Sequence, residues 1–223
     1  MRISIIIPTL NEALALPLLL RDLAGLGTSA EIIVCDGGST DATCEIAVAN
    51  GARFLQVSRG RAAQMRAGAQ EARTDLFVFL HADTRVPPEA LAAIAALAPG
   101  DIWGFWRPRL RGRSRWLPVV AFFMHWRSRL SHIATGDQGL FVGRSLYEAV
   151  EGFPEQPLME DIAICTLLRA RKAPLALPQI LESSGRRWDS AGALRTIALM
   201  WRLRLRYRMG ADPHILHGDY YGH

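Results

Sequence analysis

Two aspartates that follow apolar runs are the first candidates for chemistry. Asp36 comes directly after residues 32–35, and Asp83 follows residues 77–80 after a gap of two. A carboxylate at the end of a buried strand suits ribose hydroxyls, a base edge or a divalent cation, because Mg²⁺ and Mn²⁺ prefer hard oxygen ligands. Aspartate also serves as a plain turn or cap residue. Because both aspartates follow predicted strands, their positions favour one ligand site that the two residues share.

A second acidic group is the pair Glu160 and Asp161, which opens a predicted helix. Helix N-termini favour carboxylates through the helix dipole alone. The functional interpretation makes one of the two a general base that takes a proton from an incoming hydroxyl. Asp137 is a rival base, because residues 136–139 form a predicted tight loop that faces a ligand.

Arg59 and Arg61 flank Gly60 just before another predicted helix. Two guanidinium groups beside a helix N-terminus could hold a diphosphate, although both arginines could also be ordinary surface residues. The sequence contains neither GxGxxG nor GxxxxGK[ST]. A Rossmann dinucleotide site and a P-loop are therefore not supported.

Alternating strands and helices must position these residues. Apolar runs predict strands at 3–8, 31–35, 53–57 and 76–80, and helical spacing predicts helices at 14–26, 41–50, 61–73 and 87–97. Ser39 or Thr40 is the expected cap of the second helix. This order predicts an α/β fold with a mostly parallel sheet and helices on both faces. Ligands bind such sheets outside the carboxyl ends of the strands, where Asp36 and Asp83 fall.

The second half of the chain is less regular. We expect strands at 103–110, 139–142, 175–177 and 179–182, and helices at 117–130, 160–172 and 191–209. Arginines alternate with apolar residues over 202–208, which is a strand period, so that segment is the least clear.

Composition favours one sizeable globular domain. Of the 223 residues 50% are hydrophobic and 21% are charged, which excludes wholesale disorder. Three cysteines without a CxxC motif suit a reducing cytoplasm rather than a disulfide framework or a cysteine zinc site. The beginning of the chain lacks the features of a signal peptide. The apolar run 116–126 is shorter than the roughly 20 residues of a membrane span, so we expect a cytoplasmic protein.

Positive charge is concentrated in two segments. Residues 102–136 contain seven arginines and no acid, and residues 190–211 contain five arginines and no acid. Such segments could meet phosphates, nucleic acid or an anionic membrane surface, or could simply be solvated. We expect no nucleic-acid partner. Peripheral contact with the inner face of the cell membrane is compatible with an enzyme.

Motifs at the strand ends together resemble family 2 glycosyltransferases. They are Pro8-Thr9-Leu10-Asn11-Glu12, Asp36-Gly37-Gly38-Ser39-Thr40-Asp41 and His81-Ala82-Asp83. The match extends through Glu160-Asp161 to Ser184-Gly185-Arg186-Arg187-Trp188 and covers roughly residues 3–190. The segments 59–65, 81–84 and 136–139 are also similar to a bacterial subfamily. That subfamily is named for arsenosugar biosynthesis and was earlier described as a radical-enzyme/selenodomain-associated transferase.

The resemblance implies a single GT-A domain that binds a nucleoside diphosphate sugar with Mg²⁺ or Mn²⁺. The implied nucleotide-binding residues are Pro8, Thr9, Asn11, Glu12, Asp36, Arg59, Arg61, Gln64, His81 and Ala82. Asp83 would hold the metal, and Asp161 would be the base of an inverting transfer, with Glu160 and Asp137 as further catalytic candidates. Residues expected near the diphosphate and the acceptor are Arg187, Trp188 and Gln138.

The motifs depart from the family at three positions, one of which is Arg66, where many relatives have asparagine. His81 stands where the family usually has the first aspartate of Asp-x-Asp, and imidazole can ligate Mn²⁺ without supplying negative charge. Ser184 replaces the glutamine of QxxRW, which weakens an analogy with processive polymerases. His214 or His217 could complete the metal site, as a late histidine does in some GT-A enzymes.

We therefore predict one domain over residues 1–223, with nucleotide binding in 1–101 and acceptor recognition in 102–223, including a C-terminal helix and tail. It would move a sugar from a nucleoside diphosphate sugar to a hydroxyl of a small-molecule or lipid-linked acceptor. One alternative is a sugar-phosphate nucleotidyltransferase, which normally needs a glycine- and lysine-rich triphosphate loop. The other is a non-enzymatic module whose arginines bind nucleic acid or a membrane surface.

Overall fold

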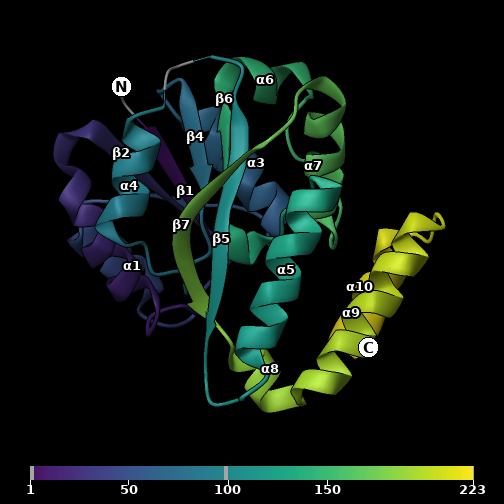
Figure 1. Ribbon diagram of the computed structural model, residues 1–223. Helices are drawn as coiled ribbons and strands as arrows, with labels where there is room; N and C mark the ends of the chain where they lie inside the picture. Colours follow the sequence, from purple (N-terminus) through teal and green to yellow (C-terminus); the bar gives the residue numbers. More distant parts are fainter. Residues whose placement is uncertain (1–2, 98–99, 223) are drawn as a thin grey trace.

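A seven-stranded sheet forms the centre of the computed structural model, which describes residues 3–97 and 100–222 without the side chains of residues 27–29, 187, 191 and 194 (Figure 1). The strand order is β3-β2-β1-β4-β6-β5-β7. In chain order the strands are β1 (Ile3–Thr9), β2 (Ala30–Asp36), β3 (Arg53–Gln56), β4 (Leu76–Phe79), β5 (Trp103–Arg111), β6 (Leu140–Gly143) and β7 (Leu175–Ser184).

Every strand pairing is parallel except those of β6, which is antiparallel to both β4 and β5. The carboxyl ends of the other six strands therefore meet at one edge of the sheet. β6 begins at that same edge, because Leu140 pairs with Phe79 near the end of β4. The loop that precedes β6, residues 136–139, is placed beside the segment that follows β4.

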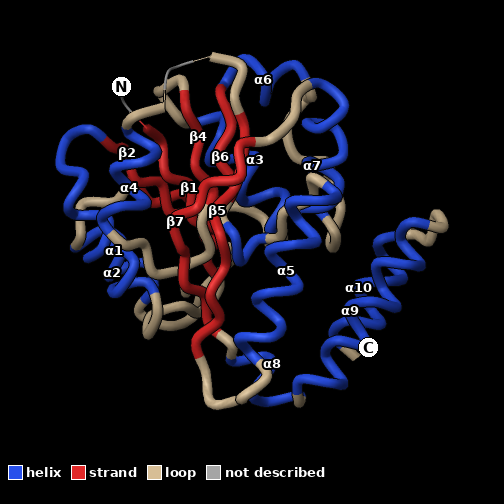
Figure 2. Tube along the Cα trace, in the orientation of Figure 1, coloured by secondary structure: helices blue, strands red, loops and turns tan. Residues whose placement is uncertain are grey.

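Helices cover both faces of the sheet (Figure 2). Ile3, Ile5 and Ile7 of β1 are buried on one face, and Ile6 is buried on the other, because successive side chains of a strand point to opposite faces. The first face is covered by α1 (Leu16–Leu23), α2 (Thr43–Ala49) and α4 (Pro88–Ala95). The second face is covered by α3 (Arg61–Glu71), α6 (Arg144–Ala149) and α7 (Glu160–Arg171).

Four further helices belong to the second half of the chain. They are α5 (Leu117–Ser131), α8 (Arg186–Ala191), α9 (Ala193–Arg208) and α10 (Pro213–Tyr221). α5 packs beside the end of β5, and α8 leads from β7 into a hairpin of α9 and α10 that stands away from the sheet (Figure 1). Leu203 and Leu216 bury the inner side of this hairpin against Leu158 and Met159, just before α7.

The predicted α/β class with a mostly parallel sheet is confirmed, and the strand positions agree to within a few residues. Two details of the sequence prediction are wrong. The strands expected at 175–177 and 179–182 form the single strand β7, whose register against β5 shifts between Trp106 and Arg107. This irregularity accommodates Pro178, which cannot donate a ladder hydrogen bond. Neither Ser39 nor Thr40 caps α2, because the Ser39 hydroxyl donates to Asp36 instead.

The helix expected at 191–209 is α9, which begins at Ala193 and ends at Arg208. Gly192 has φ of +81°, a backbone conformation that separates α8 from α9. The alternating arginines of residues 202–208 are helical within α9. The helices α6, α8 and α10 were not predicted from the sequence, and all three are short.

Candidate functional site

Asp36, the last residue of β2, organises the loop that follows it. Its Oδ1 accepts hydrogen bonds from the Thr9 and Ser39 hydroxyls, and its Oδ2 accepts from the backbone N–H groups of Gly38 and Ser39. Burial raises the pKa of Asp36, but these hydrogen bonds outweigh burial and hold the pKa below its ordinary value. A carboxylate offers about four acceptor positions, so the chain itself engages the acceptors of Asp36.

The loops after β1 and β2 are tied together. Asn11 has φ of +55°, its N–H donates to Ser39 Oγ at 2.8 Å, and its Oδ1 accepts from the Thr40 N–H at 2.8 Å. The N–H of Glu12 donates to Thr43 Oγ1 at 2.9 Å. These hydrogen bonds hold the two loops at the carboxyl ends of β1 and β2 in a fixed position relative to each other.

Two glutamines that were predicted to contact ligand are buried in the fold. Gln64 Nε2 donates to the carbonyl oxygens of Thr9 and Cys35, both at 2.7 Å. Gln138 is fully buried, and its Oε1 accepts from Ser128 Oγ at 2.7 Å. Both side chains hold the backbone in place, and their contact with a ligand stays a prediction.

Three residues from distant parts of the chain meet around Asp83. Arg186 Nη2 lies 3.2 Å from Glu12 Oε2 and 3.4 Å from Asp83 Oδ2. Burial raises the pKa of Glu12, the Arg186 guanidinium opposes this, and the charge of Asp83 adds to it. The ends of β1, β4 and β7 thus place two carboxylates on either side of one guanidinium.

His81, which follows β4, lies against the loop that precedes β6. A Cβ atom on Gly136 would fall 2.1 Å from His81 Cε1, so only glycine permits this close approach. Next along the loop, Asp137 has a raised pKa, because burial disfavours its charged form, the charge of His81 opposes the shift, and that of Asp83 adds to it. Because β6 is antiparallel, the loop that precedes it places Asp137 within electrostatic reach of His81 and Asp83.

Glu160 and Asp161 open α7 on the other side of this loop. Glu160 is 2% exposed, and its Oε1 forms an ion pair with Arg61 Nε at 2.7 Å. Burial raises the pKa of Glu160 to about 7, Arg61 opposes the shift, and Asp161 adds to it. Asp161 is only partly buried, and its Oδ1 accepts from the backbone N–H of Ile162 at 2.8 Å.

Arg127 of α5 points toward the same acidic group. Its Nη2 donates to Ser128 Oγ at 3.0 Å, and its buried Nε has no hydrogen-bond partner among residues 3–97 and 100–222. Burial lowers the pKa of Arg127, while the charges of Asp161 and Asp137 oppose that shift. Arg61 and Arg127 therefore place two cations near Asp161.

Two pockets adjoin these residues. The first is lined by His81, Gly136, Glu160 and Asp161, together with apolar residues of α3, β4 and β6. The second is lined by Asp83, Arg111, Ser184 and Arg186, with the first turn of α1 on its far side. His81 thus faces one pocket and Asp83 faces the other.

The remaining predicted positions have other surroundings. Pro8 lies inside β1 opposite Cys35, and Ala82 packs into the core beneath the sheet edge. Arg59 is exposed, and Trp188 packs on the apolar cluster under α5. Arg187 is in α8, but its side chain lies outside the described side chains. Ligand contacts of these residues stay predictions.

The two arginines that sequence reasoning missed had weak signals. Arg186 stands beside the predicted Arg187, and a shift of one position turns a helical side chain by about 100°. Arg127 belongs to the arginine-rich segment 102–136, but only the packing of α5 shows that it points inward while Arg129 is exposed.

The residues around Asp83 include oxygen ligands that a divalent cation could use. Among the described side chains, no three from His, Cys, Asp and Glu lie close enough together to hold a metal alone. Asp83 and Glu12 nevertheless flank a cationic guanidinium, with His81 within electrostatic range. The carboxylates of Asp83 and Glu12 fit Mg²⁺ or Mn²⁺ whose other ligands are phosphate oxygens and water.

The two late histidines lie on α10. The ring of His217 lies against that of Tyr221, with 4.6 Å between their centroids. The backbone N–H of His214 donates to Asp212 Oδ1 at 2.8 Å. A third metal ligand from either histidine stays a prediction.

Solved structures with the same fold include sugar transferases. One is the mannosyltransferase PcManGT of Pyrobaculum calidifontis in complex with GDP-Man and Mn²⁺, with a TM-score of 0.66, 20% identity, and coverage of 99% of this chain and 69% of that one. Another is the glucosyl-3-phosphoglycerate synthase of Mycobacterium tuberculosis with Mn²⁺, UDP and glucosyl-3-phosphoglycerate, with a TM-score of 0.63, 23% identity, and coverage of 95% and 81%. At these identities the likeness shows the fold, which is that of the GT-A class.

Similarity in sequence narrows the class of protein further. Residues 4–144, more than half of the chain, match the family model described as glycosyl transferase family 2, and the chain belongs to that family. It is also 32% identical over 146 residues to the undecaprenyl-phosphate 4-deoxy-4-formamido-L-arabinose transferase of Pseudomonas paraeruginosa. That alignment covers 59% of this chain and 41% of the relative, so this chain matches about two fifths of the relative's length.

Proposed function

We propose that this protein transfers a sugar from a nucleoside diphosphate sugar to an acceptor. The observation that carries the proposal is the convergence of Asp83, Asp137 and Asp161 at the carboxyl edge of the sheet of a family 2 chain. Carboxylates and arginines at one edge of the sheet can bind a pyrophosphate through a cation and deprotonate an acceptor. Residues 1–101 would hold the donor, and residues 102–223 would recognise the acceptor.

The donor would lie along the loops that follow β1 and β2, with its diphosphate near Asp83 and Arg186. Asp83, with Glu12 beside it, would hold Mg²⁺ or Mn²⁺. A bound cation would neutralise the charge that builds on the leaving diphosphate. Arg186 would also neutralise this charge. Its guanidinium already lies between Glu12 and Asp83, at 3.2 and 3.4 Å from their carboxylate oxygens. Complexes of the structural relatives with Mn²⁺ and nucleotide support the use of a divalent cation together with a nucleotide.

Asp161 is the proposed general base of an inverting, in-line transfer. Glu160 is unsuited to that role, because it is buried and paired with Arg61 at 2.7 Å. The raised pKa of Asp137 leaves it a weaker candidate, since burial favours its protonated form. Asp161 lines the pocket beside His81 and keeps one side open to it. We therefore infer that Glu160 positions Arg61, and that Asp161 accepts the proton.

The acceptor is proposed to be lipid-linked. The similar undecaprenyl-phosphate transferase supports this class, as do the exposed apolar side chains of α5 and α9. Arg61 and Arg127 favour a second version of the same reaction, in which the acceptor oxygen belongs to a phosphate. A phosphate oxygen is already deprotonated, and two guanidinium groups near Asp161 could hold it. In that version Asp161 orients the arginines.

The other two predicted functions have less support. The match to family 2 favours sugar transfer over nucleotidyl transfer. A binding module that uses its arginines alone leaves the acidic pockets without a role. We further propose membership of the arsenosugar-biosynthesis-type subfamily, on the segments 59–65 and 136–139, and a place at the inner face of the membrane.

Release of nucleoside diphosphate from UDP-GlcNAc and from GDP-mannose tests the proposal without a known acceptor. With Mn²⁺ present, we expect the wild type to hydrolyse one of the two donors slowly. Asp161→Asn should lower that rate about 100-fold or more, because the general base is lost. Glu89→Gln, an exposed residue of α4, is the matched control and should keep the full rate. Equal rates in all three proteins would refute the role of Asp161.

A further inference from the structure

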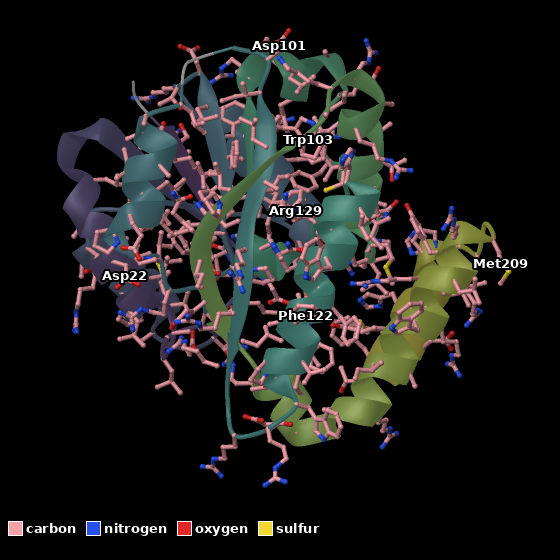
Figure 3. All side chains as sticks on the ribbon, in the orientation of Figure 1. Asp22, Asp101, Trp103, Phe122, Arg129 and Met209 are labelled. Carbon is pink, nitrogen blue, oxygen red and sulfur yellow. The ribbon has the colours of Figure 1, made fainter. Side chains whose placement is uncertain are left out.

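α5 exposes an apolar stripe opposite to its buried face. The buried side contains Leu117, Val120 and Ala121. The exposed side contains Trp116, Val119, Phe122, Phe123, Trp126 and Leu130, and Phe123 and Leu130 are 66% and 80% exposed. Figure 3 shows Phe122 on this helix. A helix that is apolar on both faces needs a second apolar environment besides the core.

α9 carries a similar exposed face. Trp201, Leu205 and Met209 follow one another at intervals of four, and their exposed fractions are 74%, 59% and 70%. Met209 lies at the end of the hairpin that is farthest from α8 (Figure 3). Exposed Arg195 and Arg208 stand on the two sides of this apolar row. Aromatic and aliphatic residues with flanking arginines are the pattern of helices that lie in a membrane interface.

Unpaired positive charge surrounds both stripes. Arg113, Arg115 and Arg129 at α5, and Arg195 and Arg208 of α9, are exposed, and none forms an ion pair within the described part of the chain. Arg206, by contrast, is paired with Asp219 of α10. The surface therefore combines large apolar side chains with uncompensated guanidinium groups.

We propose that this surface, the exposed side of α5 and α9, rests on an anionic lipid bilayer. Charge complementarity identifies the occupant, because each arginine near an anionic surface contributes about 1 kcal/mol. A second copy of the chain would place arginine against arginine. None of the described helices is long and apolar enough to cross a membrane, so the contact lies in the interface plane.

The position of the hairpin links this surface to the pocket. Leu203 of α9 and Leu216 of α10 are fully buried against Leu158 and Met159, and Met159 immediately precedes Glu160 and Asp161. The hairpin that carries the exposed row of α9 is therefore packed against the residues that lead into Glu160 and Asp161. Delivery of a lipid-linked acceptor along this path rests on the proposed function, whereas the membrane contact itself does not.

Vesicle flotation tests the proposal on the full chain. Wild-type protein should float with vesicles of phosphatidylglycerol and phosphatidylcholine, and added salt should weaken this binding. Phosphatidylcholine alone should bind less. Phe123→Ser combined with Trp201→Ser should reduce the bound fraction about tenfold, because two large apolar side chains no longer enter the interface. Arg115→Gln combined with Arg208→Gln should abolish the preference for the anionic vesicles.

Matched controls lie elsewhere on the molecule. Val48→Ser on α2 and Arg21→Gln on α1 alter exposed residues of the same types and should leave flotation unchanged. Circular dichroism of every variant establishes that it is folded. Stabilisation by UDP or GDP, measured without vesicles, separates this inference from the proposed function.

Three outcomes would overturn the membrane surface. One is a wild type that binds UDP or GDP but does not float. A second is a dimer in light scattering that Phe123→Ser and Trp201→Ser dissociate, which would assign the face to a second copy. The third is salt-sensitive binding of single-stranded RNA through the same arginines in place of vesicle binding. A protein that floats but binds no nucleotide would instead overturn the proposed function alone.

Discussion

At the scale of single residues, burial divides the acidic side chains into two kinds. Asp36 and Glu160 are almost fully buried and are engaged by the chain, through four hydrogen bonds and an ion pair respectively. Asp83 and Asp161 remain partly exposed and line the two pockets. The first kind shapes the site, and the second kind is available to a ligand.

Glu160 predicts a pH dependence of stability. Its pKa is about 7 in the folded chain against 4.5 ordinarily, so between these pH values the folded state holds a proton that the unfolded state has released. The free energy of unfolding should therefore fall as pH rises from 4.5 to 7, by up to about 3 kcal/mol. Urea unfolding at several pH values measures the slope. Glu160→Gln lacks the titrating group and should show a flatter profile over this range; a steeper one would contradict the assignment.

Sequence patterns located these residues but not the direction of their side chains. Asp83 and Asp161 were predicted from strand ends and a helix start, and both line pockets. Gln64 and Gln138 had equally good motif positions, yet their amides bond to backbone and side chains inside the fold. Inward or outward orientation depends on packing between elements, which one sequence does not encode locally.

At the scale of elements, β6 assembles the site by running against its neighbours. Because it is antiparallel, the loop of residues 136–139 begins at the carboxyl edge and meets His81. The alternation of strands and helices predicted the parallel part of the sheet. The antiparallel orientation of β6 was not predictable, because a short apolar run such as residues 139–142 does not indicate whether the strand is parallel or antiparallel to its neighbours.

A substitution at Gly136 tests the contact between this loop and His81, which follows β4. Gly136→Ala would place Cβ 2.1 Å from His81 Cε1, so the histidine ring must move. We expect a loss of about 1–3 kcal/mol in stability and a clear decrease in Mn²⁺-dependent donor hydrolysis. Thermal unfolding and the hydrolysis assay measure both effects. Gly25→Ala, whose Cβ would meet nothing within 4 Å, is the control, and equal behaviour of the two variants would disprove the contact.

At the scale of the whole molecule, the α9–α10 hairpin has one side exposed and the other side buried against the residues that precede α7. Leu203 is the buried centre of this contact, with Met159 on the other side. The tail that contains α10 had no clear apolar period, so its packing beside the acidic pair was not foreseen. Its place depends on tertiary burial rather than on local propensity.

Leu203→Ala should loosen the hairpin from α7. We expect a loss of about 2–5 kcal/mol in stability, if the hairpin unfolds together with the rest of the chain. Donor hydrolysis should decrease because Asp161 loses its support, whereas UDP binding at the opposite end of the site should persist. Leu205→Ala, at an exposed position of the same helix, provides the comparison. Unchanged hydrolysis in Leu203→Ala would remove the proposed coupling.

Calorimetric titration of UDP and GDP, with and without Mn²⁺, tests most directly whether the acidic edge of the sheet is a donor site. The account predicts that one of these nucleotides binds the wild type and that Mn²⁺ tightens its binding at least about tenfold. Asp83→Ala should lose the Mn²⁺ effect, and Glu89→Gln should retain it. An equal Mn²⁺ effect in Asp83→Ala, or no nucleotide binding by the wild type, would contradict the account.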